Sequence, residues 1–192
     1  RYAPGRLESL AFDGGIIANL KRSRWKYLLL QGFFLSMFFR AIQVARKNDI
    51  HLIHAHWMIP TGLLAGALKE LLPGDNKMLV TAHGVDLHGL RGKFFQMLRR
   101  WVAEEADATT VVSNMLLQIA RREQWPNMER VHIAPMGVDV RNIFIPAEDL
   151  REEQLLVFFG RLVEKKGPQH LVEAMRTVVD RFPACKLVIA GD

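Results

Sequence analysis

The sequence of 192 residues is poor in cysteine and lacks several common catalytic motifs. Its single cysteine, Cys185, excludes an internal disulfide and any zinc site built from Cys-x-x-Cys pairs, and it favours a reducing compartment. It contains no G-x-x-x-x-G-K-[ST] loop, no Rossmann G-x-G-x-x-G and no G-x-S-x-G elbow around Ser113. These absences argue against a P-loop nucleotide site, a dinucleotide fingerprint and a serine hydrolase.

Charge is distributed unevenly along the chain. Residues 1–48 contain nine Lys or Arg and two acids, a net charge of +7, whereas the whole chain carries +6. A basic cluster at 21–26 precedes an apolar run at 27–39, which is interrupted three times and falls short of the ~18 apolar residues of a membrane-spanning helix. Two interpretations stay open: a core helix with a solvated basic flank, or a face that binds an anionic membrane surface. We expect no nucleic acid partner, because no recognition motif accompanies the cluster.

Short apolar runs alternate with helical patterns along the chain. The runs predict strands at 50–55, 78–82, 108–112, 131–134, 155–159 and 186–190. The patterns between them predict helices at 33–48, 61–72, 91–105, 114–124 and 168–181. This alternation indicates an α/β fold with parallel sheets. We expect residues 1–140 to form a first domain, 141–154 a linker and 155–192 the start of a second domain.

A basic segment that contains glycine follows the fifth predicted strand. Ligands of open parallel sheets bind beyond the carboxyl ends of the strands. Gly160 lets a ligand approach the backbone closely, and Arg161 offers a bidentate donor to phosphate. Lys165 and Lys166 add positive charge, and a Gly-Pro pair then begins a helix whose free amides favour anions. The segment predicts a phosphate or diphosphate site; the alternative is a solvated basic loop that caps a helix.

A histidine also stands at the end of the second predicted strand. His83 can hydrogen-bond a sugar hydroxyl or stabilise developing charge, and Gly84 permits a sharp turn beside it. The alternative is an ordinary hydrogen-bonded polar residue at a strand end. Asp86 and His88 follow closely, and they either orient His83 or serve the turn.

Three more histidines lie in and next to the first predicted strand. Strand alternation places His54 and His56 on one face and His51 on the other. Because no further cluster of ligands accompanies the pair, we expect no metal site. His56 and Trp57 are instead expected to line a polar substrate pocket.

Five motifs occur in an order that is typical of one enzyme family. They are His54-Ala-His-Trp57, Thr81-Ala-His-Gly84, Ala106-Asp-Ala108 with Val111-Val-Ser113, Pro135-Met-Gly-Val-Asp139 and Gly160-Arg-Leu-Val-Glu-Lys-Lys-Gly167. The set resembles the GT-B glycosyltransferases of family 4, the group-1 retaining sugar transferases, over about 50–192. Residues 1–49 fit the variable acceptor side of the first domain. The resemblance implies a GT-B fold of two Rossmann-like parallel-sheet domains, the first nearly complete and the second truncated.

The resemblance implies a retaining glycosyltransferase that moves a sugar from a nucleoside-diphosphate sugar to a glycan or lipid-linked acceptor. By its motifs, Arg161 and Lys166 hold the donor diphosphate with Gly160, and His83 is the catalytic residue beside the donor sugar. Gly84, Asp86 and His56 fall in the donor and acceptor pocket. Because cations already meet the charge of the leaving diphosphate, we expect no metal and no other cofactor. The expected location is cytoplasmic, with peripheral attachment to the inner face of the membrane.

The sequence also departs from the family pattern. Met136 stands where the family commonly has Asn. The first strand of the fold is expected before Arg1 and the acidic E-x7-E segment after Asp192, so we expect these 192 residues to be inactive alone. Two alternative functions stay open: a GT-B sugar-nucleotide epimerase, and a non-catalytic GT-B scaffold that binds a nucleotide.

Overall fold

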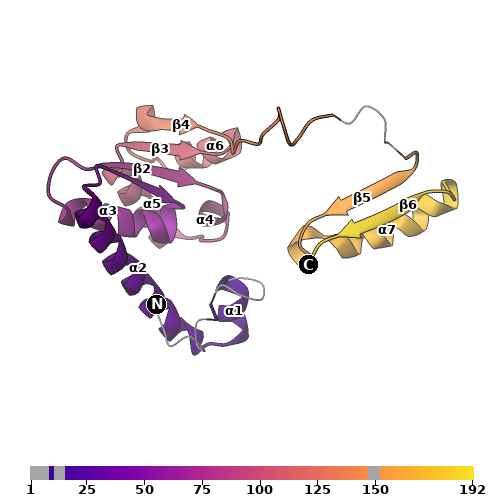
Figure 1. The fold of residues 1–192 in the computed structure, drawn as a ribbon, viewed down its shortest axis with the longest axis horizontal. Coiled ribbons are helices and arrows are strands. Elements are labelled where there is room, and N and C mark those ends of the chain that lie inside the picture. The colour runs from indigo at the N-terminus through magenta and orange to yellow at the C-terminus, as the bar shows by residue number, and fades with distance from the viewer. Residues whose placement is uncertain (1–8, 11–15, 147–151) are drawn as a thin grey trace. The chain divides into compact units, whose positions relative to one another are not determined.

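The computed structural model of the chain describes residues 9–10, 16–146 and 152–192. These residues form two compact units that divide between Gly137 and Val138, and each unit has its own parallel sheet (Figure 1). The predicted α/β fold class with parallel sheets is confirmed. The described part of the expected linker 141–154 contains no helix or strand, and its residues 147–151 lie outside the described residues.

The sheet of the first unit has four parallel strands in the order of the sequence. They are β1 (Leu52–His56), β2 (Lys77–Ala82), β3 (Ala108–Val111) and β4 (Val131–Ile133). All four lie where the apolar runs predicted them, with ends that differ by no more than two residues. The register places His56 opposite Thr81, and Thr81 opposite Thr110. All carboxyl ends therefore meet at one edge of the sheet, where ligands of such sheets bind.

Helical segments connect these strands. They are α1 (Ile16–Arg22), α2 (Lys26–Asn48), η2 (Met58–Gly62), α3 (Leu63–Leu71), α4 (Val85–His88), α5 (Lys93–Glu105), α6 (Asn114–Arg122) and η3 (Met128–Arg130). The predicted N-cap of α6 is present, because Ser113 Oγ accepts a hydrogen bond from the backbone N–H of Leu116. The short segments α1, α4, η2 and η3 were not predicted from the sequence, since they are too brief to show a clear period.

The core of the first unit lies between its sheet and the helices α3, α5 and α6. Two glycines allow α3 and α5 to approach each other closely: a Cβ at Gly62 would lie 2.8 Å from Val102 Cγ1, and one at Gly66 would lie 2.7 Å from the ring of Trp101. Each fully buried aliphatic side chain contributes about 1.5–3 kcal/mol to folding. Those with no exposed surface include Met58, Met78, Val80, Val102 and Val111.

Helix α2 is longer than the sequence predicted. The prediction began it at residue 33, whereas the structure begins it at Lys26 and ends it at Asn48. Its last part packs on α3, where Ala45 joins Leu68 and Leu72 in a small apolar cluster. By length and composition alone α2 meets the requirement for a membrane-crossing helix, and little of it is buried. This corrects the sequence estimate, which counted only uninterrupted apolar residues.

The second unit contains one strand–helix–strand repeat. The strands β5 (Leu155–Phe159) and β6 (Lys186–Ala190) are parallel neighbours, and α7 (Pro168–Arg181) connects them after the short turn η4 (Glu164–Lys166). All three long elements have the predicted bounds. Gly167 has the left-handed backbone angle φ of 71° and caps α7, while Pro168 is its first residue, as expected.

Candidate functional site

The carboxyl edge of the first sheet brings two histidines into direct contact. His56 is the last residue of β1, and His83 follows β2 by one residue. His56 Nδ1 lies 2.9 Å from His83 Nε2, a hydrogen-bond distance, and the ring centroids are 5.1 Å apart. The structure therefore brings together two of the residues that the sequence analysis assigned to the site. The sequence analysis had instead suggested Asp86 and His88 as neighbours of His83.

A row of polar side chains, which we call the polar ladder, continues from this pair across the sheet and consists of His54, Thr81 and Thr110. The rings of His54 and His56 lie 4.3 Å apart, which confirms that they share a face. His54 Nε2 is 2.8 Å from Thr81 Oγ1, which is 2.7 Å from Thr110 Oγ1. Partial burial lowers the pKa of His54 below its ordinary value, and charge on His56 or His83 would lower it further. His54 is therefore neutral at neutral pH.

His51 lies apart from this ladder. Its Nε2 is 3.3 Å from Asp49 Oδ2, and both side chains are largely exposed. In the described part of the chain no group of three or more His, Cys, Asp or Glu side chains could hold a metal ion. The expectation that the protein works without metal stays a prediction.

Asp86 holds the two loops that carry Trp57 and His83. Its side chain is buried, and Oδ1 accepts the backbone N–H of Gly84 at 2.9 Å while Oδ2 accepts that of Met58 at 2.7 Å. Both oxygens thus face the backbone, and Gly84 turns the chain with a φ of 100° that other residues rarely adopt. Asp86 can therefore influence a substrate pocket by holding these two loops in place.

A buried arginine, which the sequence analysis did not single out, supports the same loop from below. Arg99 is 1% exposed, and its Nη1 donates to the carbonyls of Asp86 and Leu90 at 3.2 and 2.8 Å. Its Nε donates to Glu123 Oε2 at 2.8 Å, and Trp125 Nε1 donates to the same oxygen at 3.0 Å. These bonds and the ion pair with Glu123 offset the free-energy cost of burying the guanidinium charge. The sequence alone does not distinguish Arg99 from its neighbour Arg100, which is exposed.

Trp57 stands exposed at the same edge. Its backbone has φ 76° and ψ 131°, an uncommon conformation for a residue with a side chain. Three hydrogen bonds hold it there: its N–H donates to Thr81 O at 2.7 Å, and its carbonyl accepts from Gly62 N and Thr61 Oγ1. Uncommon backbone angles that surrounding bonds maintain are frequent at functional sites. The expectation that Trp57 and His56 line a substrate pocket stays a prediction.

In the second unit, two cations lie where the sequence predicted an anion site. Arg161 and Lys166 are exposed, and neither side chain bonds another residue in the described ranges. Gly160 N donates to Ala190 O at 3.0 Å, and Leu162 N to Asp192 O at 2.7 Å, which fix the loop to the end of β6. The side chain of Lys165 lies outside the described residues. The loop that leads into α7 thus contains two exposed cations, and such a loop suits a phosphate group.

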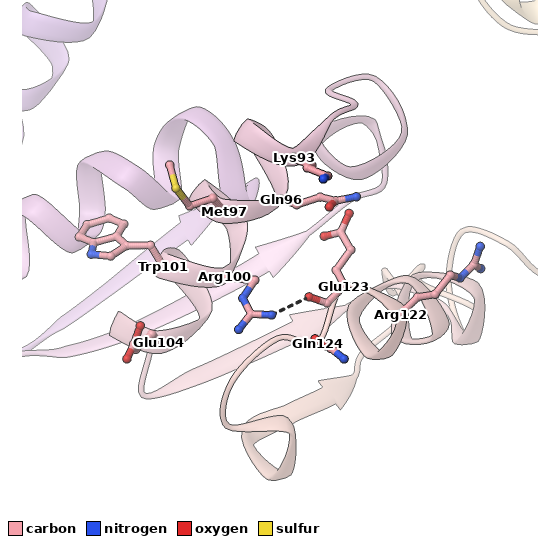
Figure 2. A pocket seen from close by; sticks show the side chains of 9 residues that line it. All are labelled: Lys93, Gln96, Met97, Arg100, Trp101, Glu104, Arg122, Glu123 and Gln124. Carbon is pink, nitrogen blue, oxygen red and sulfur yellow. Dashed lines mark hydrogen bonds between the residues drawn. The ribbon is translucent and has the colours of Figure 1, made fainter.

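A groove of about 520 Å³ lies elsewhere on the first unit. It follows α5 and ends at residues 122–124, at the end of α6 (Figure 2). Arg100 Nη1 donates to the carbonyl of Glu123 across it at 3.3 Å. None of the site residues predicted from the sequence lines this groove. We therefore describe two candidate sites separately: the strand ends of the first unit, and the loop between β5 and α7 of the second unit.

Two family profiles cover nearly the whole chain. A profile described as Glycosyltransferase Family 4 matches residues 2–142, and one described as Glycosyl transferases group 1 matches residues 141–192. The boundary between the two matches lies in the segment that follows the first unit. The α/β fold with parallel sheets is consistent with both.

The curated proteins with related sequences include named glycosyltransferases and one synthase. N-acetyl-alpha-D-glucosaminyl L-malate synthase of Bacillus anthracis is 24% identical over 169 residues, 82% of this chain and 43% of that protein. GDP-mannose-dependent monoacylated alpha-(1-6)-phosphatidylinositol monomannoside mannosyltransferase of Corynebacterium glutamicum is 28% identical over 166 residues, 78% of this chain and 41% of that protein. D-inositol 3-phosphate glycosyltransferase of Segniliparus rotundus is 24% identical over 159 residues, 73% of this chain and 34% of that protein.

The chain thus spans 34–43% of the length of these relatives. The first profile alone covers more than half of the chain, and its bounds enclose the histidine pair and the loop of Asp86. Together with the motifs and the two parallel sheets, this match settles the family: the chain belongs to glycosyltransferase family 4.

Proposed function

We propose that the protein to which this chain belongs transfers a sugar from a nucleoside-diphosphate sugar to a glycan or lipid-linked acceptor, with retention of configuration. The observation that carries the proposal is the pair of unbonded cations, Arg161 and Lys166, beside the start of α7 in a member of glycosyltransferase family 4. When the bond between the sugar and the diphosphate breaks, the leaving diphosphate gains negative charge. Two cations and the helix amides stabilise that charge, so the reaction needs no metal or other cofactor.

Calorimetry with a nucleoside diphosphate tests the anion site in the complete protein. Arg161→Ala removes a charged hydrogen-bond donor, which is worth about 1.5–3 kcal/mol, so Kd should rise about 10- to 150-fold. Arg176→Ala is the matched control, because Arg176 is an exposed arginine further along α7 with no bonded partner among the described residues. Equal affinity of the Arg161 and Arg176 variants would refute the diphosphate assignment.

The proposed catalytic residue is His83, at the end of β2. A side chain that stabilises the charge developing near the reacting carbon acts mainly in the transition state. His83→Ala should therefore lower kcat much more than it weakens donor binding. Steady-state kinetics together with calorimetry separate the two effects. Parallel losses in kcat and in donor affinity would make His83 a binding residue only.

Analysis of the reaction products separates this function from its two alternatives. A transferase releases the nucleoside diphosphate and joins the sugar to the acceptor. An epimerase that follows the other interpretation changes the sugar without an acceptor, and a scaffold binds the nucleotide without turnover. Formation of a glycosylated acceptor in proportion to the released diphosphate is the expected result.

The proposed location is the inner face of the membrane, with α2 and its basic flank as the contact. Tyr27, Leu28, Leu35 and Phe39 are all more than half exposed, and α2 follows the basic cluster of residues 21–26. An apolar helix surface with flanking positive charge binds anionic lipid headgroups by combining burial with electrostatic attraction. Lipid-linked acceptors would then lie within reach of the first unit.

Sedimentation with vesicles of phosphatidylcholine, with and without phosphatidylserine, tests this location. Each basic residue near an anionic surface contributes about 1 kcal/mol, so the double variant Arg22→Gln/Arg24→Gln should bind about thirtyfold more weakly. The control is Arg121→Gln/Arg122→Gln, which removes the same charge at the exposed end of α6. Binding that ignores phosphatidylserine would remove the surface proposal. Protein that stays with the vesicles in alkaline carbonate would instead indicate that α2 crosses the bilayer.

A further inference from the structure

The contact between His56 and His83 restricts what His83 can offer to a substrate. A hydrogen bond between two imidazole nitrogens contains one proton, which belongs to one ring or the other. His83 uses Nε2 in this bond, so Nδ1 is the nitrogen that remains for a ligand. If His83 donates through Nε2, its Nδ1 is bare and accepts; if His56 donates, His83 Nδ1 holds a proton and donates.

No other described side chain provides this bond to His83. The two neighbours that the sequence suggested are used elsewhere or lie apart: Asp86 accepts two backbone N–H groups, and no hydrogen bond joins His88 to His83. Rotation and proton placement of the His83 ring therefore depend on His56. Free imidazole in water exchanges between both tautomers and many orientations, so a fixed partner removes that freedom.

The ring of His56 is itself supported from behind. The ring of His54 lies 4.3 Å from it, and Thr81 holds His54 through a 2.8 Å contact to Nε2. Thr81 is buried and is anchored in turn by Thr110. Because His54 is neutral at neutral pH, it packs against His56 without charge repulsion. A chain of contacts thus connects the threonines of the sheet, through His54 and His56, to His83 at its edge.

We propose that His56 is a positioning residue, which fixes the ring orientation and the tautomer of His83 through the bond from Nδ1 to Nε2. The role rests on the proposed function, in that His83 is the group that meets the donor sugar. His56 then acts on the reaction without touching the sugar's reacting carbon. Its loss should leave donor binding intact but let His83 present the wrong nitrogen, or the wrong polarity, for part of the time.

Nitrogen NMR of the complete protein labelled with 15N-histidine tests the pair directly. In the native protein His83 should show two well-separated ring-nitrogen signals that indicate a single tautomer. His56→Phe keeps a ring but has no nitrogen, so the His83 signals should move toward the averaged values of free imidazole. His56→Asn places an amide near the position of Nδ1 and should restore the separation. His51→Phe is the control and should change nothing, because His51 precedes β1 and its ring contacts Asp49.

Kinetics of the same variants test the consequence. We expect His56→Phe to lower kcat about three- to tenfold, the value of one hydrogen bond, with a donor KM within about twofold of the native value. His56→Asn should recover most of kcat. Unchanged His83 signals in His56→Phe, or equal losses of kcat in the Phe and Asn variants, would overturn the proposal.

The two readouts distinguish failure of this proposal from failure of the proposed function. The NMR signature of His83 needs no turnover, so it reports on the pair whatever the reaction is. If the signals respond as expected while His83→Ala keeps full activity, the pair exists but the catalytic role of His83 is wrong. If His83→Ala abolishes turnover while the signals ignore His56, the catalytic role stands and the positioning role falls.

Discussion

Replacement of Asp86 by asparagine tests whether one buried carboxylate holds both loops at the sheet edge. The side chain is 2% exposed, and its two oxygens accept the backbone N–H groups of Met58 and Gly84 at 2.7 and 2.9 Å. An asparagine has nearly the same shape but only one acceptor oxygen. Whichever way the amide turns, one backbone N–H then faces an NH2 group.

The magnitude follows from these two bonds. Loss of a hydrogen bond to a charged acceptor costs about 1.5–3 kcal/mol, and a buried donor without a partner costs about 1–3 kcal/mol. The two costs overlap, because both describe the same unpaired N–H. We therefore expect Asp86→Asn to lower the free energy of unfolding of the first unit by about 2–4 kcal/mol.

Urea denaturation followed by tryptophan fluorescence measures this loss in the first unit. All four tryptophans of the chain lie within residues 1–137, so the signal does not report the second unit. Asp75→Asn is the control, because the Asp75 side chain is 85% exposed and bonds only Lys77 among the described residues; it should change stability by less than about 0.5 kcal/mol. A loss below about 1 kcal/mol for Asp86→Asn, or one equal to the control, would refute the reasoning.

Two further predictions concern the second unit and the polar ladder. A Cβ at Gly191 would lie 1.8 Å from the carbonyl oxygen of Gly160, so Gly191→Ala should disturb the predicted diphosphate loop. Calorimetry should then show weaker binding of a nucleoside diphosphate. Gly137→Ala is the control and should leave binding unchanged, because a Cβ at Gly137 meets open space. The pKa of His54 is lowered from 6.5 in the folded state, so between these two pKa values His54 is protonated in the unfolded chain and neutral in the folded chain. The contribution of His54 to the stability of the first unit should thus be fully present above pH 6.5 and be lost as the pH drops through 6.5 and the lowered pKa. Urea titrations at several pH values should show a smaller fall for His54→Gln.

The strands and most helices were predictable because burial leaves a direct trace in the sequence. A strand of a parallel sheet reads as a short apolar run, and such runs predicted β5 and β6 to the residue. Helix α7 was equally clear, since glycine and proline mark its start and an amphipathic pattern fills it.

Helix α2 shows where such a trace is missing. Its first residues, 26–32, are exposed or half-buried, and none of them belongs to a core cluster that would impose a period of 3.6 residues. The prediction therefore found only the later part of the helix, which packs on α3 through Ala45. Backbone hydrogen bonds extend the helix over residues whose side chains give no periodic signal.

The hydrogen-bond partner of His83 could not be predicted from the sequence, for a different reason. Asp86 and His88 lie close in sequence, and sequence distance was the only available guide to neighbours of His83. In the sheet, the register between β1 and β2 decides instead: His54 contacts Thr81 and His56 contacts His83, and both pairs are 27 residues apart in the sequence.

One register therefore makes both contacts, and a slip of one residue would turn both histidines of β1 away from their partners. The connection between the two strands includes η2 and α3. The same connection is tied down by Asp86 at Met58 and by the hydrogen bond from Trp57 N–H to Thr81 O. A substitution that shifts this connection should break the ladder and the histidine pair together, because neither is specified separately.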